Sequence, residues 1–190
     1  LVDSDCISQS NINRQLIALT STVGKPKVEV MAQRALDINP EINVFPLHIL
    51  YNENTRESFF CHDYDYIIDA IDLVSAKLDL IETALSRGYR IISAMGTGNK
   101  SDPTAFRVTD ISKTQNCPLA RVMRRELRER GILHHEVVYS PEKAITPLPL
   151  ESPPPGRRSI PASLPWVPSS AGLLLAAHVV GSLTADIQSK

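Results

Sequence analysis

Two short apolar segments on either side of an amphipathic stretch constrain the fold more than any other feature of the chain. The run YDYIIDAI at residues 64–71 is apolar between acids, and residues 90–95 form a second apolar run. Between them, residues 74–87 have helical spacing, and Gly88 is a typical helix-ending residue. Buried strands that alternate with helices at this spacing form βαβ units. The sequence therefore predicts an α/β, Rossmann-like fold with a mainly parallel sheet and flanking helices.

The remaining patterns add further elements on both sides of this unit. Helices are expected at 28–36 and 118–131, and strands at 42–50, 105–111 and 136–139. Eight of the 14 prolines fall between Pro147 and Pro168, which predicts a loop, because proline supplies no backbone donor. A largely apolar helix is expected at 171–187.

Composition excludes several classes of protein. The 190 residues suit one domain of ordinary size, and the net charge of −1 gives no overall electrostatic reason to bind nucleic acid or membrane. The three cysteines form no CxxC pair, so we expect no disulfide framework and no structural zinc, as in a cytoplasmic protein. The longest apolar run, 171–180, is too short to span a bilayer, which predicts no membrane association.

Five polar residues near the start have side chains that suit a nucleotide: Asp3, Asn11, Arg14, Gln15 and Lys27. An acid at the end of a strand can hold a ribose hydroxyl. A guanidinium fork and an ammonium point charge together suit a polyphosphate. The two amides are weaker candidates, because such side chains also satisfy backbone groups near the start of a helix.

Asp69 and Asp72 lie at the carboxyl end of the apolar run, at the edge where open α/β sheets bind their ligands. A carboxylate there can hold Mg²⁺ together with substrate phosphates. We expect Asp72 in this role more than Asp69. The alternative for Asp72 is the N-cap of the next helix.

Arginines are concentrated in the helix expected at 118–131. Four of them share one face at three- and four-residue spacing: Arg121, Arg124, Arg125 and Arg128. Such a face is usually solvated, and the alternative is a local contact with nucleic-acid phosphates. Cys117, just before this helix, has no partner in the sequence that would activate it, so we expect an ordinary thiol.

The ordered set Asp3, Asn11, Arg14, Gln15 and Lys27 resembles the adenylating core of the E1-like (ThiF/MoeB/HesA) superfamily. Two later segments sharpen the resemblance. Residues 93–132, SAMGTGNKSDPTAFRVTDISKTQNCPLARVMRRELRERGI, and residues 167–183, VPSSAGLLLAAHVVGSL, are similar to the tRNA threonylcarbamoyladenosine dehydratases, one branch of that superfamily.

This resemblance implies an enzyme that uses ATP and Mg²⁺ to activate the carboxylate of threonylcarbamoyladenosine at position 37 of a tRNA and then cyclises it. It assigns Asp3 to the ribose, Asn11 and Gln15 to a neighbouring polar pair, Arg14 and Lys27 to the phosphates, and Asp72 to the metal. Arg14 and Asp72 are the expected catalytic residues. The implied partners are the modified tRNA, a second copy in a homodimer and sulfur-transfer proteins.

The resemblance also implies a domain organisation: a partial E1-like domain at 1–145, a Pro-rich loop at 146–168, and a closing helix at 169–190 packed on the same domain. Such a fold normally begins with a strand, a Gly-rich turn and a helix, and none of these is present at the start of the sequence. We therefore expect N-terminal truncation and weak ATP binding by residues 1–190 alone. Two alternatives stay open, a sulfur-carrier adenylyltransferase and a non-catalytic E1-like fragment.

Overall fold

The computed structural model describes residues 1–146 and 162–188, with the side chains of 186–188 left aside. The chain divides into two compact units, Leu1–His62 and Asp63–Lys190, and each is described by itself. Most of the Pro-rich segment lies outside the described residues.

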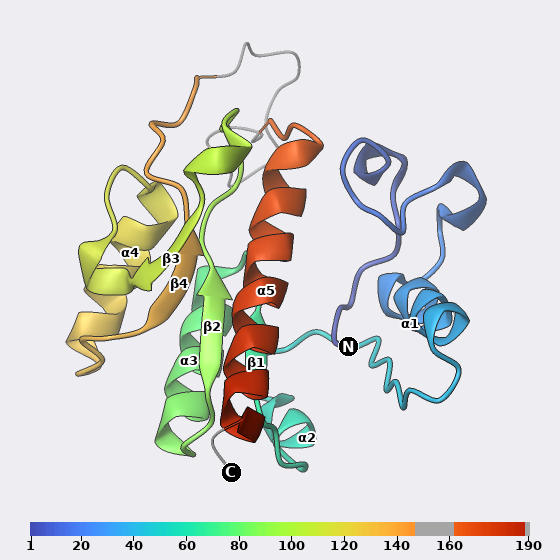
Figure 1. Ribbon diagram of the computed structural model, residues 1–190, viewed down its shortest axis with the longest axis horizontal. Coiled ribbons are helices and arrows are strands. Elements are labelled where there is room, and N and C mark those ends of the chain that lie inside the picture. Colours follow the sequence, from blue (N-terminus) through green and yellow to red (C-terminus); the bar gives the residue numbers. More distant parts are fainter. Residues whose placement is uncertain (147–161, 189–190) are drawn as a thin grey trace. The chain divides into compact units, whose positions relative to one another are not determined.

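The second unit is built on a four-stranded sheet (Figure 1). Its strands are β1 (Ile67–Asp69), β2 (Ile91–Ala94), β3 (Arg107–Asp110) and β4 (Glu136–Tyr139), in the order β1-β2-β4-β3. The β1–β2 and β2–β4 pairs are parallel, and β3 pairs antiparallel with β4. The predicted α/β class with a mainly parallel sheet is therefore confirmed.

Helices cover both faces of this sheet. α3 (Val74–Ser86) and α4 (Pro118–Glu129) pack together on one face, and α5 (Trp166–Gln188) lies along the other (Figure 1). Successive strand residues point to opposite faces. Ile92 and Val138 accordingly face α5 and form a buried cluster with three of its residues: Ala171, Leu175 and Val179.

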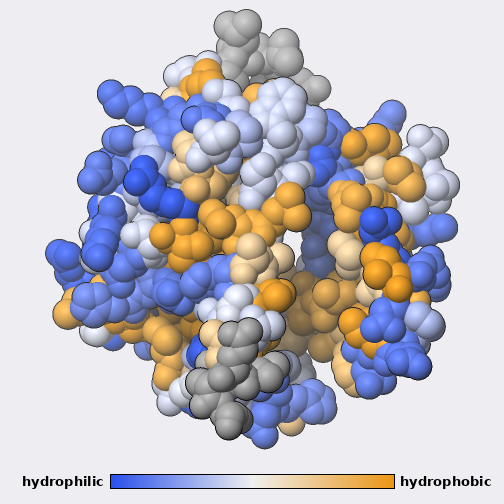
Figure 2. All heavy atoms as spheres, viewed as in Figure 1, coloured by the Kyte–Doolittle hydropathy of each residue, from blue (hydrophilic) through white to orange (hydrophobic). Residues whose placement is uncertain are grey.

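α5 begins at Trp166, five residues before the predicted start, because Pro168 lies in the first turn, where no backbone donor is required. The stretch Trp166–Ala185 is long and apolar enough, by length and composition alone, to cross a membrane. Buried core helices of soluble proteins meet the same criteria. One stripe of α5 packs on the sheet, whereas Leu173 is 72% exposed. Apolar side chains gather over α5, and the surface over α4 is mostly hydrophilic (Figure 2).

A buried polar network joins the strands on the α3 side of the sheet. The Lys77 ammonium and the Asp69 carboxylate are both fully buried and lie 2.6 Å apart. The Ser93 hydroxyl donates to the same Asp69 oxygen at 2.6 Å and lies 2.8 Å from Nε2 of His135. The second Asp69 oxygen accepts from the backbone N–H of Ile71 at 3.0 Å. The network therefore ties α3, β1, β2 and the entry to β4 together.

The hydrogen bonds also define the protonation of this network. Ser93 uses its single proton on Asp69, so Nε2 of His135 must carry a proton and donate it to the Ser93 oxygen. Burial, followed by the positive charge of Lys77, lowers the pKa of His135 to about 4. Burial also lowers the pKa of Lys77, and Asp69 opposes that shift.

The first unit consists of short helices and turns. α1 (Lys27–Ile38) matches the predicted helix, and α2 (Arg56–Phe59) is a single turn. The prediction of a strand at 42–50 is wrong. Only Leu47 in that range forms a β-bridge, an isolated one with Val2. Pro46, immediately before Leu47, has no N–H to extend that ladder.

We expect Lys77→Met to lower the free energy of unfolding by about 3–5 kcal/mol, because it leaves the Asp69 carboxylate buried without a counter-charge. Lys113→Met, at an exposed lysine of the same unit, is the matched control and should change stability by less than about 0.5 kcal/mol. Urea unfolding monitored by circular dichroism measures both. Equal midpoints for the two variants would contradict the role given to the pair.

Stability should also fall as the pH drops from 6.5 towards 4. In that window the unfolded chain protonates His135 and the folded chain does not, so protons favour unfolding. The shift to about 4 corresponds to a contribution of about 3 kcal/mol that is fully present above pH 6.5. His135→Gln replaces the ring N–H donor with an amide N–H donor that cannot titrate. Urea unfolding of this variant should therefore show a weaker pH dependence. An unchanged pH profile would mean that His135 does not control acid stability.

Candidate nucleotide site

Lys27 lies between two carboxylates in the first unit. Its Nζ is 2.7 Å from Oδ2 of Asp5 and 3.7 Å from Oδ2 of Asp3. A short backbone ladder sets this arrangement, because the N–H of Lys27 donates to the Asp5 carbonyl and the N–H of Ile7 donates to the Lys25 carbonyl. Gly24 makes the turn between these segments with a φ of +87°. The structure thus brings together the predicted pair Asp3 and Lys27.

Asp5 is a member of this cluster that sequence reasoning missed. Asp3 turns back on the chain, since its Oδ1 accepts from the N–H of Asp5 at 2.8 Å. That turn leaves Asp5, rather than Asp3, closest to the ammonium. The Asp3-x-Asp5 spacing was the available signal, because a short acidic side chain often bonds the backbone two residues on.

Asn11, Arg14 and Gln15 share one tight turn. The carbonyl of Asn11, at the end of the 3₁₀ turn η1 (Gln9–Asn11), accepts from the N–H groups of Arg14 and Gln15 at 3.0 and 2.9 Å. The Asn11 side chain is buried, and its oxygen accepts from the N–H of Ser8 at 3.1 Å. Asn11 therefore stabilises the loop backbone that presents the other two side chains.

Arg14 carries a positive charge that no carboxylate balances among the described residues. Its Nη1 donates to the carbonyl of Ser10 at 2.9 Å and to the side-chain oxygen of Asn13 at 2.8 Å, both neutral groups. These two contacts use one end of a five-donor guanidinium. The rest of the fork is available to an anion.

Gln15 provides a test of whether the loop fits a polar ligand. Its Oε1 is buried and has no hydrogen-bond partner within the described part of the chain. Buried polar groups are almost always paired, so this oxygen, on the residue after Arg14, has room for a hydrogen-bond donor. The residues present therefore fit a ligand with polar and anionic groups, such as a nucleotide.

Asp69 and Asp72 have different environments in the second unit. Asp69 is fully engaged in the buried network and has no free oxygen for a metal. Asp72 is exposed in the loop between β1 and α3, and the N-cap of α3 is Leu73, so the capping alternative for Asp72 is wrong. Residues 1–146 and 162–188 contain no group of three His, Cys, Asp or Glu side chains that could hold a metal ion.

The loop after β2 is clamped to the segment after β4. Lys100 is buried and donates to the carbonyls of Ser140 and Glu142 at 3.2 and 2.7 Å. In return, the Glu142 carboxylate accepts from the N–H groups of Ser101 and Asp102. Asn99, with a φ of +60°, bonds both Ile145 and Ala162 through its backbone. This reciprocal clamp was not predicted from sequence.

Comparisons with known proteins agree with this architecture. The ThiF family model matches residues 1–189. The chain is 43% identical to the tRNA threonylcarbamoyladenosine dehydratase of Bacillus subtilis over 199 residues, covering 100% of this chain and 78% of that protein. It is 40% identical to the tRNA threonylcarbamoyladenosine dehydratase 2 of Saccharomyces cerevisiae over 75% of this chain and 33% of that protein.

A solved structure covers the whole chain. The E. coli tRNA N6-threonylcarbamoyladenosine dehydratase, TcdA, in complex with ATP, superposes with a TM-score of 0.87 at 30% identity, covering 100% of this chain and 76% of that protein. With a family model matched along nearly its full length and a relative at 43% identity, this chain belongs to the ThiF family, on the branch of the tRNA threonylcarbamoyladenosine dehydratases.

Proposed function

We propose that this protein is an ATP-dependent tRNA threonylcarbamoyladenosine dehydratase. It activates the carboxylate of the modified adenosine at position 37 and closes that group into a ring, with net loss of water. The observation that carries the proposal is the 43% identity, over the full chain, to a protein of that name. The Arg14 charge, which no carboxylate balances among the described residues, and the unpaired Gln15 side-chain oxygen support a nucleotide in the first unit.

The reaction needs an activated carboxylate. A carboxylate oxygen is a poor leaving group, and ATP, when bound, supplies the adenylyl group that turns this oxygen into part of a phosphate. The protein's own task is to position the two reactants and to stabilise negative charge at the phosphate.

The residues of the first unit fit these tasks. Arg14 would hold phosphate oxygens with the donors that Ser10 and Asn13 leave free. Lys27 already uses its ammonium on Asp5 and Asp3, and its side chain is 15% exposed. A phosphate would therefore share this ammonium with the carboxylates. Asp3 would accept a ribose hydroxyl, and the Gln15 amide would pair with the ligand.

Asp72 would hold a magnesium ion, which would neutralise negative charge on the phosphates. Its carboxylate is exposed and makes no hydrogen bond within the described residues. Mg²⁺ usually takes one or two carboxylates, several waters and substrate phosphates, so a single aspartate is sufficient. We further propose a cytoplasmic homodimer that acts on tRNA carrying threonylcarbamoyladenosine and receives sulfur-transfer proteins as partners.

Arg14→Ala and Lys27→Ala should each weaken ATP binding by about 10-fold or more, since a charge-assisted hydrogen bond contributes about 1.5–3 kcal/mol. Arg34→Ala and Lys25→Ala are matched controls at exposed cations of the same unit and should bind ATP like the wild type. Isothermal titration calorimetry of the full-length protein measures all four. If both Arg14→Ala and Lys27→Ala bound ATP with wild-type affinity, the proposed nucleotide site would be contradicted.

The substrate class is tested by pyrophosphate release. Release that requires tRNA with threonylcarbamoyladenosine, and is absent with unmodified tRNA, supports the dehydratase. Release that requires the C-terminal glycine of a ubiquitin-like carrier would instead assign a sulfur-carrier adenylyltransferase. No release with either substrate would assign a non-catalytic protein.

A further inference from the structure

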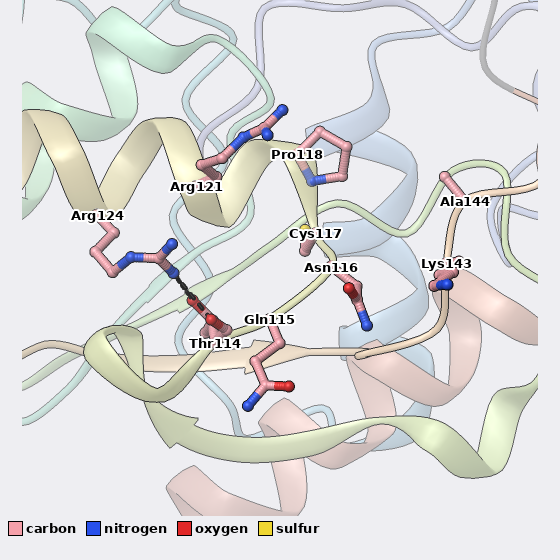
Figure 3. A pocket seen from close by; sticks show the side chains of 9 residues that line it. All are labelled: Thr114, Gln115, Asn116, Cys117, Pro118, Arg121, Arg124, Lys143 and Ala144. Atoms are coloured by element: carbon pink, nitrogen blue, oxygen red, sulfur yellow. Dashed lines mark hydrogen bonds between the residues drawn. The ribbon is translucent and has the colours of Figure 1, made fainter.

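A pocket of about 360 Å³ lies at the start of α4, and none of the residues assigned to ATP lines it (Figure 3). It is lined by residues from the approach to α4, by the first two turns of that helix and by the segment after β4. Arg121 and Arg124 extend from α4, and Lys143 comes from the segment after β4 (Figure 3).

The charge of the lining has one sign. Three of its nine residues are cations, and none is Asp or Glu. Arg121 and Lys143 have no ion pair within the described residues, and Arg124 bonds only neutral oxygens of Thr114, at 3.0 and 2.7 Å. The nearest carboxylate along the chain, Glu142, is occupied by the loop after β2. The pocket therefore favours an anion.

The other arginines of α4 lack this property. Arg125 pairs with Glu126 and Glu129, and Arg130 pairs with Glu82 and Glu126. Arg128 is exposed and does not line the pocket. The arginine face expected from helical spacing is thus divided, and only Arg121 and Arg124 belong to the pocket.

The walls of the pocket are held in place before any ligand arrives. Asn116 has a left-handed backbone with a φ of 58°, and its amide donates to the carbonyl of Pro141 at 3.0 Å. Thr114 bonds Ile111 through its hydroxyl at 2.7 Å while it accepts from Arg124. Cys117, which also lines the pocket, is buried. A preorganised cationic wall loses little entropy when it binds an anion.

The lining also indicates what kind of anion binds. It contains no aromatic side chain, so a nucleobase would find no stacking surface. Its volume is near the lower end of the range of about 300–1,000 Å³ for ligand pockets, which admits a phosphate and part of its sugar. Phosphate oxygens are the usual partners of arginine and lysine in nucleic-acid complexes.

We propose that this pocket binds a backbone phosphate of the RNA substrate and so orients the RNA on the second unit. The inference rests on the proposed function, because it takes the substrate to be a tRNA. The contact carries no sequence information. It fixes the position of the RNA while other groups select the modified base.

The test measures binding of a tRNA transcript to the full-length protein by fluorescence anisotropy over a series of salt concentrations. Arg121→Ala and Lys143→Ala should each weaken binding about 5- to 8-fold at 0.1 M salt. Each should also lower the slope of log K against log salt by about 0.7–0.9, the value for one lost phosphate contact. Arg121→Lys keeps the charge and should keep most of the slope. Arg128→Ala is the matched control and should bind like the wild type.

Two results would overturn the proposal. One is a wild-type slope in both Arg121→Ala and Lys143→Ala. The other is loss of inorganic phosphate binding in these variants while their RNA binding is unchanged, which would assign the pocket to a free anion. Cyclisation of modified tRNA by the wild-type protein is assayed in parallel. An inactive wild type would reject the proposed function, whereas an active wild type with unaffected variants would reject only the pocket.

Discussion

The Lys77 ammonium is enclosed by protein, and the Asp69 carboxylate 2.6 Å away supplies the opposite charge that makes this burial tolerable. Ser93 and His135 extend the same hydrogen-bonded chain into β2 and to the entry of β4. A buried charge that loses its partner destabilises a protein strongly, so these four side chains must keep their relative positions. The strand ends that carry Asp69 and Ser93, and the α3 turn that carries Lys77, are consequently held in register. Asp72 lies only three residues after Asp69, and its place at the carboxyl edge of β1 depends on this interaction.

The first unit is held together differently, since its described residues form short helices and turns with two isolated bridges and no sheet. It uses tight turns in which side chains replace missing backbone partners. Asn11 bonds Ser8, Asp3 bonds Asp5, and Arg14 reaches back to Ser10. Such turns orient a guanidinium and an amide with few residues. They leave Oε1 of Gln15 buried without a hydrogen-bond partner among the described residues.

Sequence patterns predicted the second unit well and the first unit less well. Strands β1, β2 and β4 and helices α3 and α4 were all expected from periodicity, because a buried sheet imposes continuous apolar runs on its strands. The segment around Leu47 alternates loosely between apolar and polar residues, a pattern that also predicts a strand, but it forms only one bridge. The local pattern does not reveal whether a partner strand is present. Lys77 was not predicted as a core residue, because a lysine on a helix is usually solvated. The separation of Arg121 from Arg125 likewise depends on Glu126 and Glu129, whose side-chain directions helical spacing alone leaves open. The assignment of Arg14, Lys27 and Asp72 to ATP and magnesium stays a prediction.

Asn99 has a consequence for how this protein can vary. Its backbone accepts from the N–H of Ile145 at 2.7 Å and donates to the carbonyl of Ala162 at 2.8 Å, and its side chain accepts from the N–H of Ala162 at 2.7 Å. The two ends of the connection between β4 and α5 are thereby fastened to a single residue. The entropy of closing a loop changes only slowly with its length. Asn99 therefore holds the segment that carries Lys143 and the approach to α5 against the loop after β2, whatever length of chain separates Ile145 from Ala162.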